Sequence, residues 1–146
     1  MTEITFQRPS RPLSSAEAIV MNAFRDLPAG FELVSNSKLH SDDGLIAFVP
    51  DFIVRSSDGS QLVIEVKSPA SLSMINLEKL RRIGRMLNIS GKKFLVIVVG
   101  SEFDGAYVKQ SVASEPLNIQ WATKPADILR ATLKEFDRRP DALSDS

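Results

Sequence analysis

The chain has 146 residues, of which 43% are hydrophobic and 25% charged, a size and balance that fit one globular domain with a single core. It contains no cysteine and one histidine, which excludes disulfides, thiolate metal sites, a cysteine nucleophile and multi-histidine metal sites, so a bound metal would need oxygen ligands. Its 18 basic residues equal its 18 acidic residues, and the net charge alone therefore indicates neither a nucleic-acid partner nor a membrane partner.

Both ends of the chain are predicted to lie outside the folded domain. Residues 1–13 contain two prolines and are predicted to form an irregular N-terminal arm, residues 140–146 have the composition of a flexible tail, and residues 14–139 form one domain. The N-terminal segment lacks the apolar stretch of a signal peptide, and the longest apolar run, Phe94–Val99, is too short to cross a membrane. We therefore expect a cytoplasmic protein without a membrane partner.

The hydrophobic pattern predicts an alternation of helices and strands, which is typical of an α/β fold. A first helix is expected to begin at Ser14, because Ser14 and Glu17 have the spacing of a capping box and the apolar residues after them recur at helical spacing as far as Leu27. The remaining elements are predicted, in chain order, as strands at Phe31–Ser35, Ala47–Arg55 and Gln61–Lys67, a helix at Ser73–Asn88, strands at Lys93–Val99 and Asn118–Ala122, and a helix at Ala126–Arg138.

Asp58 and Gly59 are a strong signal for a hairpin turn between the second and third predicted strands. In an antiparallel pair the numbers of opposed residues have a constant sum, and a turn centred on Asp58 places Asp51 opposite Glu65. Lys67 shares their face, because side chains alternate along a strand. Two opposed carboxylates repel each other unless a cation neutralises them, and Mg²⁺ is commonly held by one or two carboxylates with water and phosphate oxygens. The hairpin therefore predicts a metal site with a lysine beside it.

A purely structural interpretation of these three charges stays open. Asp51 could simply begin a strand, and Glu65 and Lys67 could form an exposed salt-bridged row. However, these charges interrupt an otherwise apolar strand, Leu62–Lys67, and burying charges is costly unless they are paired or used. We therefore favour the metal site.

The segments Pro50–Asp51 and Glu65–Lys67, joined by the predicted hairpin, resemble the signature of the PD-(D/E)XK nuclease superfamily. The order of helix, three strands, helix and strand is similar to the restriction-endonuclease-like core of that superfamily. Junction resolvases and transposon end-cleaving nucleases are among the nearest members in pattern. The resemblance covers about Ser14–Val99 and implies a mixed central sheet of four to five strands flanked by helices, followed here by a further strand and a C-terminal helix.

The resemblance implies a Mg²⁺-dependent endonuclease in which Mn²⁺ could replace Mg²⁺. Asp51 and Glu65 match the metal-binding acids, and the main-chain carbonyl of Val66 matches a further metal ligand. Lys67 matches the catalytic lysine that positions the attacking water. Many members carry a glutamate on the first helix that completes the metal site, and Glu17 stands where that glutamate would be. The capping box needs the same glutamate for a structural reason, so both roles of Glu17 stay open.

The neutral total charge conceals two oppositely charged segments. Residues 31–66 hold two basic and six acidic residues, whereas residues 67–100 hold seven basic residues and one acidic residue. Lys79, Arg82 and Arg85 recur every three residues on the second predicted helix and would form a basic stripe that nucleic-acid phosphates could follow. A solvated helix face is the commoner origin of such a stripe and stays open.

Together these features predict an endonuclease that hydrolyses phosphodiester bonds, in DNA rather than RNA, with a metal-activated water. The main alternative is a non-catalytic DNA-binding or assembly subunit with the same fold, and an RNA-directed nuclease is a third option. Because one chain carries one such site, cutting both strands would require a homodimer or a partner subunit. His40, the lone histidine, is assigned to a polar surface loop, Lys38–Gly44.

Overall fold

A mixed sheet of five strands organises the part of the chain that the computed structural model describes, namely residues 2–5, 15–34, 37–40, 47–69, 72, 74–100 and 118–137. The strand order is β2-β5-β6-β7-β8; the β2–β5 and β5–β6 pairs are antiparallel, and the β6–β7 and β7–β8 pairs are parallel. This confirms the α/β fold with a mixed sheet of four to five strands. The strands are β2 (Phe31–Val34), β5 (Phe52–Ser56), β6 (Gln61–Lys67), β7 (Lys93–Val99) and β8 (Ile119–Ala122).

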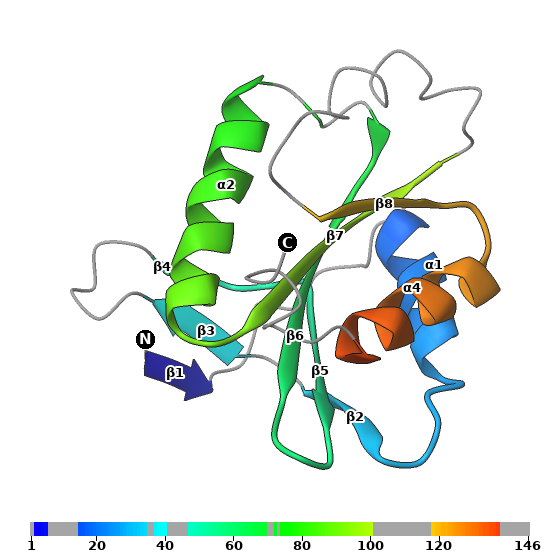
Figure 1. Ribbon diagram of the computed structural model, residues 1–146. Coiled ribbons are helices and arrows are strands. Elements are labelled where there is room, and N and C mark those ends of the chain that lie inside the picture. Colours follow the sequence, from blue (N-terminus) through cyan, green and yellow to red (C-terminus); the bar gives the residue numbers. More distant parts are fainter. Residues whose placement is uncertain are drawn as a thin grey trace.

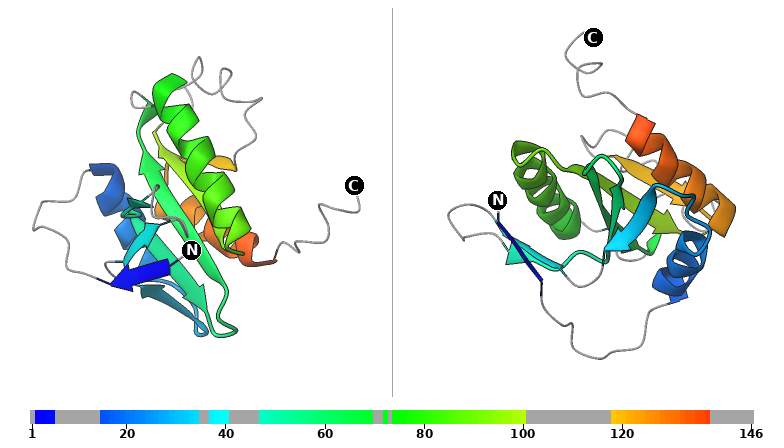
Figure 2. Two further views of the ribbon diagram at one scale, coloured as in Figure 1. Left: turned by 90° about the vertical axis from the view of Figure 1, so that its left-hand side faces the viewer. Right: turned by 90° about the horizontal axis from the view of Figure 1, so that it is seen from below.

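Helices cover both faces of this sheet (Figure 1, Figure 2). One helix, α2, lies against one face, whereas α1 and α4 lie side by side against the other. The order of helix, three sheet strands, helix and strand is consistent with the restriction-endonuclease-like core that the resemblance implied. The helices are α1 (Ser15–Phe24), α2 (Met74–Ile89) and α4 (Pro125–Asp137).

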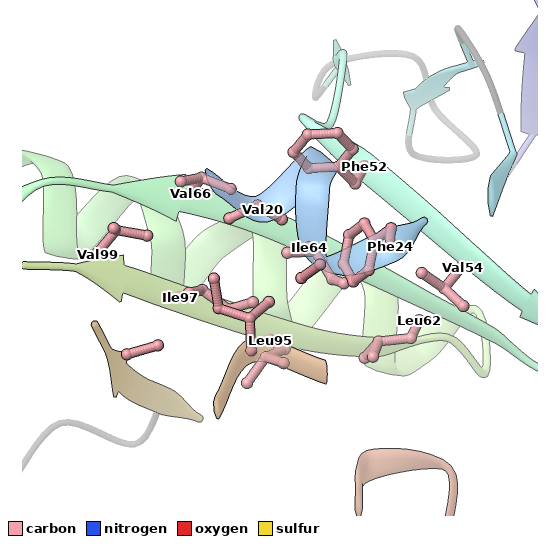
Figure 3. Close-up of a cluster of buried hydrophobic side chains, with 13 residues drawn as sticks. Val20, Phe24, Phe52, Val54, Leu62, Ile64, Val66, Leu95, Ile97 and Val99 are labelled. Carbon is pink, nitrogen blue, oxygen red and sulfur yellow. The ribbon is translucent and has the colours of Figure 1, made fainter. Parts of the chain in front are cut away.

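Strand β6 is apolar on both faces over most of its length, and alternate side chains pack under different helices. Leu62, Ile64 and Val66 belong to the cluster of buried side chains beneath α1 and α4 (Figure 3). The intervening Val63 packs with Ile83 of α2 on the opposite face. Such two-sided burial explains why these strands read as nearly continuous apolar runs in the sequence.

A second, smaller sheet corrects two predictions about the N-terminal part of the chain. It has the order β1-β3-β4, formed by Thr2–Thr5, Ser37–His40 and Ala47–Phe48. The prediction of an irregular arm was wrong for Thr2–Thr5, because these residues pair with a strand that lies more than 30 positions away in the sequence. The assignment of His40 to a loop was also wrong, because His40 ends β3 and is paired on both sides.

The predicted strand Ala47–Arg55 is divided into β4 and β5. The break contains Pro50, which has no backbone N–H to donate to a sheet, and Asp51, which precedes β5 in a bend. This division matters for the site, because it sets Asp51 at the start of β5 rather than in the middle of a longer strand.

Several predictions concern residues outside the described part of the chain. They include the N-cap residue Ser14, the segment 140–146, and the first residue of the predicted second helix, Ser73. Within the described residues, no helix is both long and apolar enough to cross a membrane.

Candidate active site

The β5–β6 hairpin has the register that the sequence predicted. Phe52 pairs with Ile64, and the next three pairs keep the same sum of residue numbers. Gly59 in the turn has a φ of 91°, a left-handed conformation that glycine adopts without steric penalty. Continued by one step beyond the Phe52–Ile64 pair, this register brings Asp51 opposite Glu65 at the open end of the hairpin.

Asp51 and Glu65, which we call the carboxylate pair, each accept a backbone hydrogen bond from the opposite segment at this end of the hairpin. The backbone N–H of Asp51 donates to Glu65 Oε1 over 3.0 Å, and the backbone N–H of Val66 donates to Asp51 Oδ2 over 2.8 Å. Each carboxylate therefore binds the main chain of the opposite segment, beyond the last ladder pair. Because both donors are backbone groups, the two acidic side chains are held next to each other by the fold itself.

Lys67 lies beside the carboxylate pair on β6. Its Nζ is 4.0 Å from Glu65 Oε2, and the side chains of Lys67 and Glu65 are 27% and 12% exposed. Two residues along a strand return to the same face, which explains the proximity. The low exposure of Glu65 differs from the exposed salt-bridged row that was the structural alternative. The structure thus brings Asp51, Glu65 and Lys67 together.

The carboxylate pair lies on the face of the sheet that α2 covers. Val63, two residues before Glu65 on β6, packs against Ile83 of α2, and Ile53, two residues after Asp51, belongs to the same cluster. Val66 points to the opposite face, toward α1 and α4. The apolar α2 face therefore ends in a polar site at the carboxyl end of β6.

The donor set of this site fits a hard divalent cation. A carboxylate has two oxygens with about four lone-pair sites, so it can accept a backbone hydrogen bond and also coordinate a cation. Mg²⁺ prefers carboxylate and other oxygen donors and retains several water or phosphate ligands. The backbone of Val66 is adjacent to the carboxylate pair, because its N–H donates a hydrogen bond to Asp51. The role of the Val66 carbonyl as a metal ligand stays a prediction.

Glu17 approaches the sheet from the other side. It lies in the first turn of α1, is 6% exposed, and precedes by three residues Val20, which packs in the cluster beneath α1 and α4. Within the described residues, no group of three or more His, Cys, Asp or Glu side chains is arranged to hold a metal ion. The structure therefore does not join Glu17 to the carboxylate pair in such a group, and both predicted roles of Glu17 stay predictions.

The three basic residues predicted to bind nucleic acid occupy exposed positions on α2. Lys79, Arg82 and Arg85 are exposed, and the side chains of the two arginines are 65% and 66% exposed. Their exposure agrees with a basic stripe. Contact with nucleic acid stays a prediction, because exposure fits a solvated helix face equally well.

Glu78 modifies this stripe in a way that the sequence reasoning missed. Its carboxylate is 3.1 Å from Arg81 and 4.0 Å from each of Arg82 and Arg85. The signal was present, because Glu78 precedes Arg82 by four residues, the spacing that favours ion pairs on a helix. One carboxylate therefore offsets part of the positive charge on the outer side of α2.

A scan against protein-family models finds no matching family, and a search of curated proteins finds no match. A search of solved structures finds similarity to the EndoMS–dsDNA2 complex, with 20% sequence identity and a TM-score of 0.39, over 83% of this chain and 50% of that chain. The chain thus spans about half the length of that solved chain.

Proposed function

We propose that the chain is a metal-dependent nuclease of the PD-(D/E)XK type that hydrolyses phosphodiester bonds, with DNA as the substrate. One observation carries the proposal: the backbone of the hairpin holds Asp51 and Glu65 side by side, with Lys67 4.0 Å from Glu65. Two adjacent carboxylates repel each other, and a bound cation relieves that repulsion. The basic residues on α2 supply a surface that phosphates can follow.

Each residue of the site has a role in this proposal. Asp51 and Glu65 hold Mg²⁺ or Mn²⁺, together with the main-chain carbonyl of Val66. When bound, the metal supplies Lewis-acid polarisation of the phosphoryl group. The ammonium group of Lys67 positions the attacking water and offsets the negative charge that develops on the phosphate oxygens. A homodimer or a partner subunit supplies the second site for a cut in both strands.

The direct test compares the wild type with two variants at the site. We expect cleavage of linear, branched or single-stranded DNA only when Mg²⁺ or Mn²⁺ is added. Lys67→Ala and Glu65→Gln should each lower the cleavage rate by at least about 100-fold, because several kcal/mol of transition-state stabilisation are lost. Circular dichroism of both variants checks that the fold is retained. An absence of metal-dependent cleavage on every DNA substrate would sink the proposal, and cleavage of RNA alone would reassign the substrate.

The non-catalytic alternative is favoured by one feature of the same site. The two backbone hydrogen bonds already satisfy part of the carboxylate pair, so the pair can stabilise the hairpin without a metal. A DNA-binding or assembly subunit would bind DNA without cutting it. In that case the wild type should bind DNA and leave it uncut when Mg²⁺ is present, and Glu65→Gln should not change the affinity for DNA.

A further inference from the structure

Helix α2 runs over the face of the sheet that carries the carboxylate pair, and its packing relates each helix turn to positions on the strands below. The amino end of α2 and the carboxyl end of β6 lie at the same end of the sheet (Figure 1). Ile83 of α2 packs in one cluster with Ile53 of β5 and Val63 of β6. These contacts fix which helix turn lies above which strand residues.

The carboxylate pair lies two strand residues beyond this cluster, toward the carboxyl end of β6. On the helix, four residues before Ile83 is Lys79, a displacement of about 6 Å along the axis. On the strands, Glu65 follows Val63 and Asp51 precedes Ile53 by two residues each, a displacement of about 6.7 Å. With these standard rises per residue, the two displacements agree to within about 1 Å. Lys79 and the carboxylate pair therefore lie at the same position along the direction of the strands.

A second cluster independently places the same turn of α2 at the same position along the strands. Leu80, the neighbour of Lys79, packs with Val96 and Val98 of β7. In the parallel β6–β7 ladder, Val96 is the register partner of Glu65, and Val98 is the register partner of Lys67. The helix turn that contains Leu80 therefore lies above the strand positions of the candidate site.

The side of the helix on which Lys79 lies also follows from these contacts. Residues at i, i+4 and i+7 share one side of a helix, and Lys79, Ile83 and Met86 have this spacing. Ile83 and Met86 pack in one cluster with Ile53 of β5 and Val63 of β6, against which Phe94 of β7 also packs, so this side of α2 lies over the part of the sheet where β5 and β6 meet. Lys79 continues that side by one turn, toward the end of the sheet where the carboxylate pair lies, and its side chain is exposed there.

Arg82 and Arg85 lie on a different side of α2. With Glu78 they have the same i, i+4, i+7 spacing, on a line turned by about 100° from the line of Lys79, because each of them precedes a residue of that line by one position. Glu78 is 4.0 Å from each arginine, whereas the ion pairs among the described residues do not include Lys79. The three basic residues of the predicted stripe thus divide into one lysine near the site and two arginines next to a carboxylate.

We propose that Lys79 binds a phosphate group of DNA next to the carboxylate pair, and that it belongs to the site together with Lys67 rather than to the outer arginines. The proposal rests on the proposed nucleic-acid function of this site. The Nζ of Lys79 donates hydrogen bonds to a non-bridging oxygen of the phosphate that neighbours the scissile one. Arg82 and Arg85 contribute less to binding, because Glu78 offsets their charge and competes with phosphate for them.

The test is a binding titration with a fluorescent DNA duplex, followed by anisotropy in Ca²⁺ over a range of salt concentrations. Lys79→Ala should weaken binding by about 5- to 10-fold and should lower the slope of log K against log [salt] by about 0.9, the value for one lost phosphate contact. Lys79→Arg should restore most of the slope. Lys134→Ala removes an exposed lysine from α4, on the other side of the sheet, and should change neither quantity. Arg85→Ala should have a smaller effect than Lys79→Ala.

Glu78→Gln provides a second arm. Without the carboxylate, Arg85 gains access to phosphate, so Arg85→Ala should cost more in the Glu78→Gln background than in the wild type. The proposal for Lys79 is overturned if Lys79→Ala behaves like Lys134→Ala, if Arg85→Ala weakens binding more than Lys79→Ala, or if the wild type does not bind DNA.

Cleavage kinetics separate this proposal from the proposed catalytic function. If the wild type cleaves DNA, Lys79→Ala should raise KM about 5- to 10-fold with kcat within about threefold of the wild type, whereas Lys67→Ala lowers kcat. A loss of kcat in Lys79→Ala with unchanged KM would overturn the binding role. If the wild type binds but does not cleave, the nuclease proposal fails, and the salt slope still decides the role of Lys79.

Discussion

The two ends of the β5–β6 hairpin use the same interaction for different purposes. At the turn, Asp58 accepts hydrogen bonds from the Ser56 hydroxyl and the Ser60 backbone N–H, both two residues away in the sequence. At the open end, Asp51 accepts from the Val66 N–H and donates its own N–H to Glu65, over 15 and 14 residues. A carboxylate bound by local neighbours shapes a turn, whereas carboxylates bound across the chain bring distant acidic groups together.

The two ends of the hairpin also differ in how deeply their residues are buried. The turn is exposed, whereas the open end lies directly above the buried Phe52–Ile64 pair, and the side chain of Glu65 retains 12% exposure. A site whose supporting residues belong to the core is held more rigidly than one on a surface loop. The open end is therefore the part of the hairpin suited to chemistry, and the two ends should respond differently to substitution.

The largest effect on stability is expected for the core beneath the open end. Ile64→Ala should lower the free energy of unfolding by about 2–5 kcal/mol, because it removes buried methyl and methylene groups and leaves a cavity. Glu65→Gln, one residue further on the opposite face, should cost about 1 kcal/mol or less, since the glutamine oxygen still accepts from the Asp51 N–H. Urea denaturation measures both. Equal losses would mean that Glu65 is as much a structural residue as Ile64.

A smaller effect is expected at Glu17, which distinguishes the two faces of the sheet near the open end. Glutamine can still cap a helix but cannot serve as an anionic metal ligand. Because α1 packs on the face opposite the carboxylate pair, we expect Glu17→Gln to keep metal-dependent cleavage within about threefold of the wild type. Initial rates over a Mg²⁺ titration measure this. A shift of the midpoint of the titration to a higher Mg²⁺ concentration, or a loss of cleavage rate of tenfold or more, would place Glu17 among the metal ligands.

The smallest effect is expected at the turn. Hydrogen bonds from the Ser56 side chain and from Ser60 lower the pKa of Asp58 from 3.8 to about 2. The folded state therefore favours the ionised form of Asp58. The contribution of this carboxylate to stability is present above about pH 4 and is lost as the pH falls toward 2. Melting temperatures of the wild type and Asp58→Asn should converge over that range. A constant difference between pH 5 and pH 2 would contradict the assigned cause.

The sequence alone determined the hairpin and its register. The Asp58–Gly59 turn and the alternation of apolar residues are local signals, and they place Asp51, Glu65 and Lys67 on one face before any tertiary contact is known. The bounds of β6 and β7 were predicted without error for the same reason, since long apolar runs are the strongest strand signal.

Only the tertiary structure decided how distant segments meet. The pairing of Thr2–Thr5 with Ser37–His40 depends on contacts between segments whose separation carries no local signal. The level of Lys79 relative to the carboxylate pair is set by the packing of α2 on the sheet, because helical spacing gives the side of a helix but not its position along a strand. Periodicity is a property of the local chain, and the translation of one element against another is a property of side-chain packing.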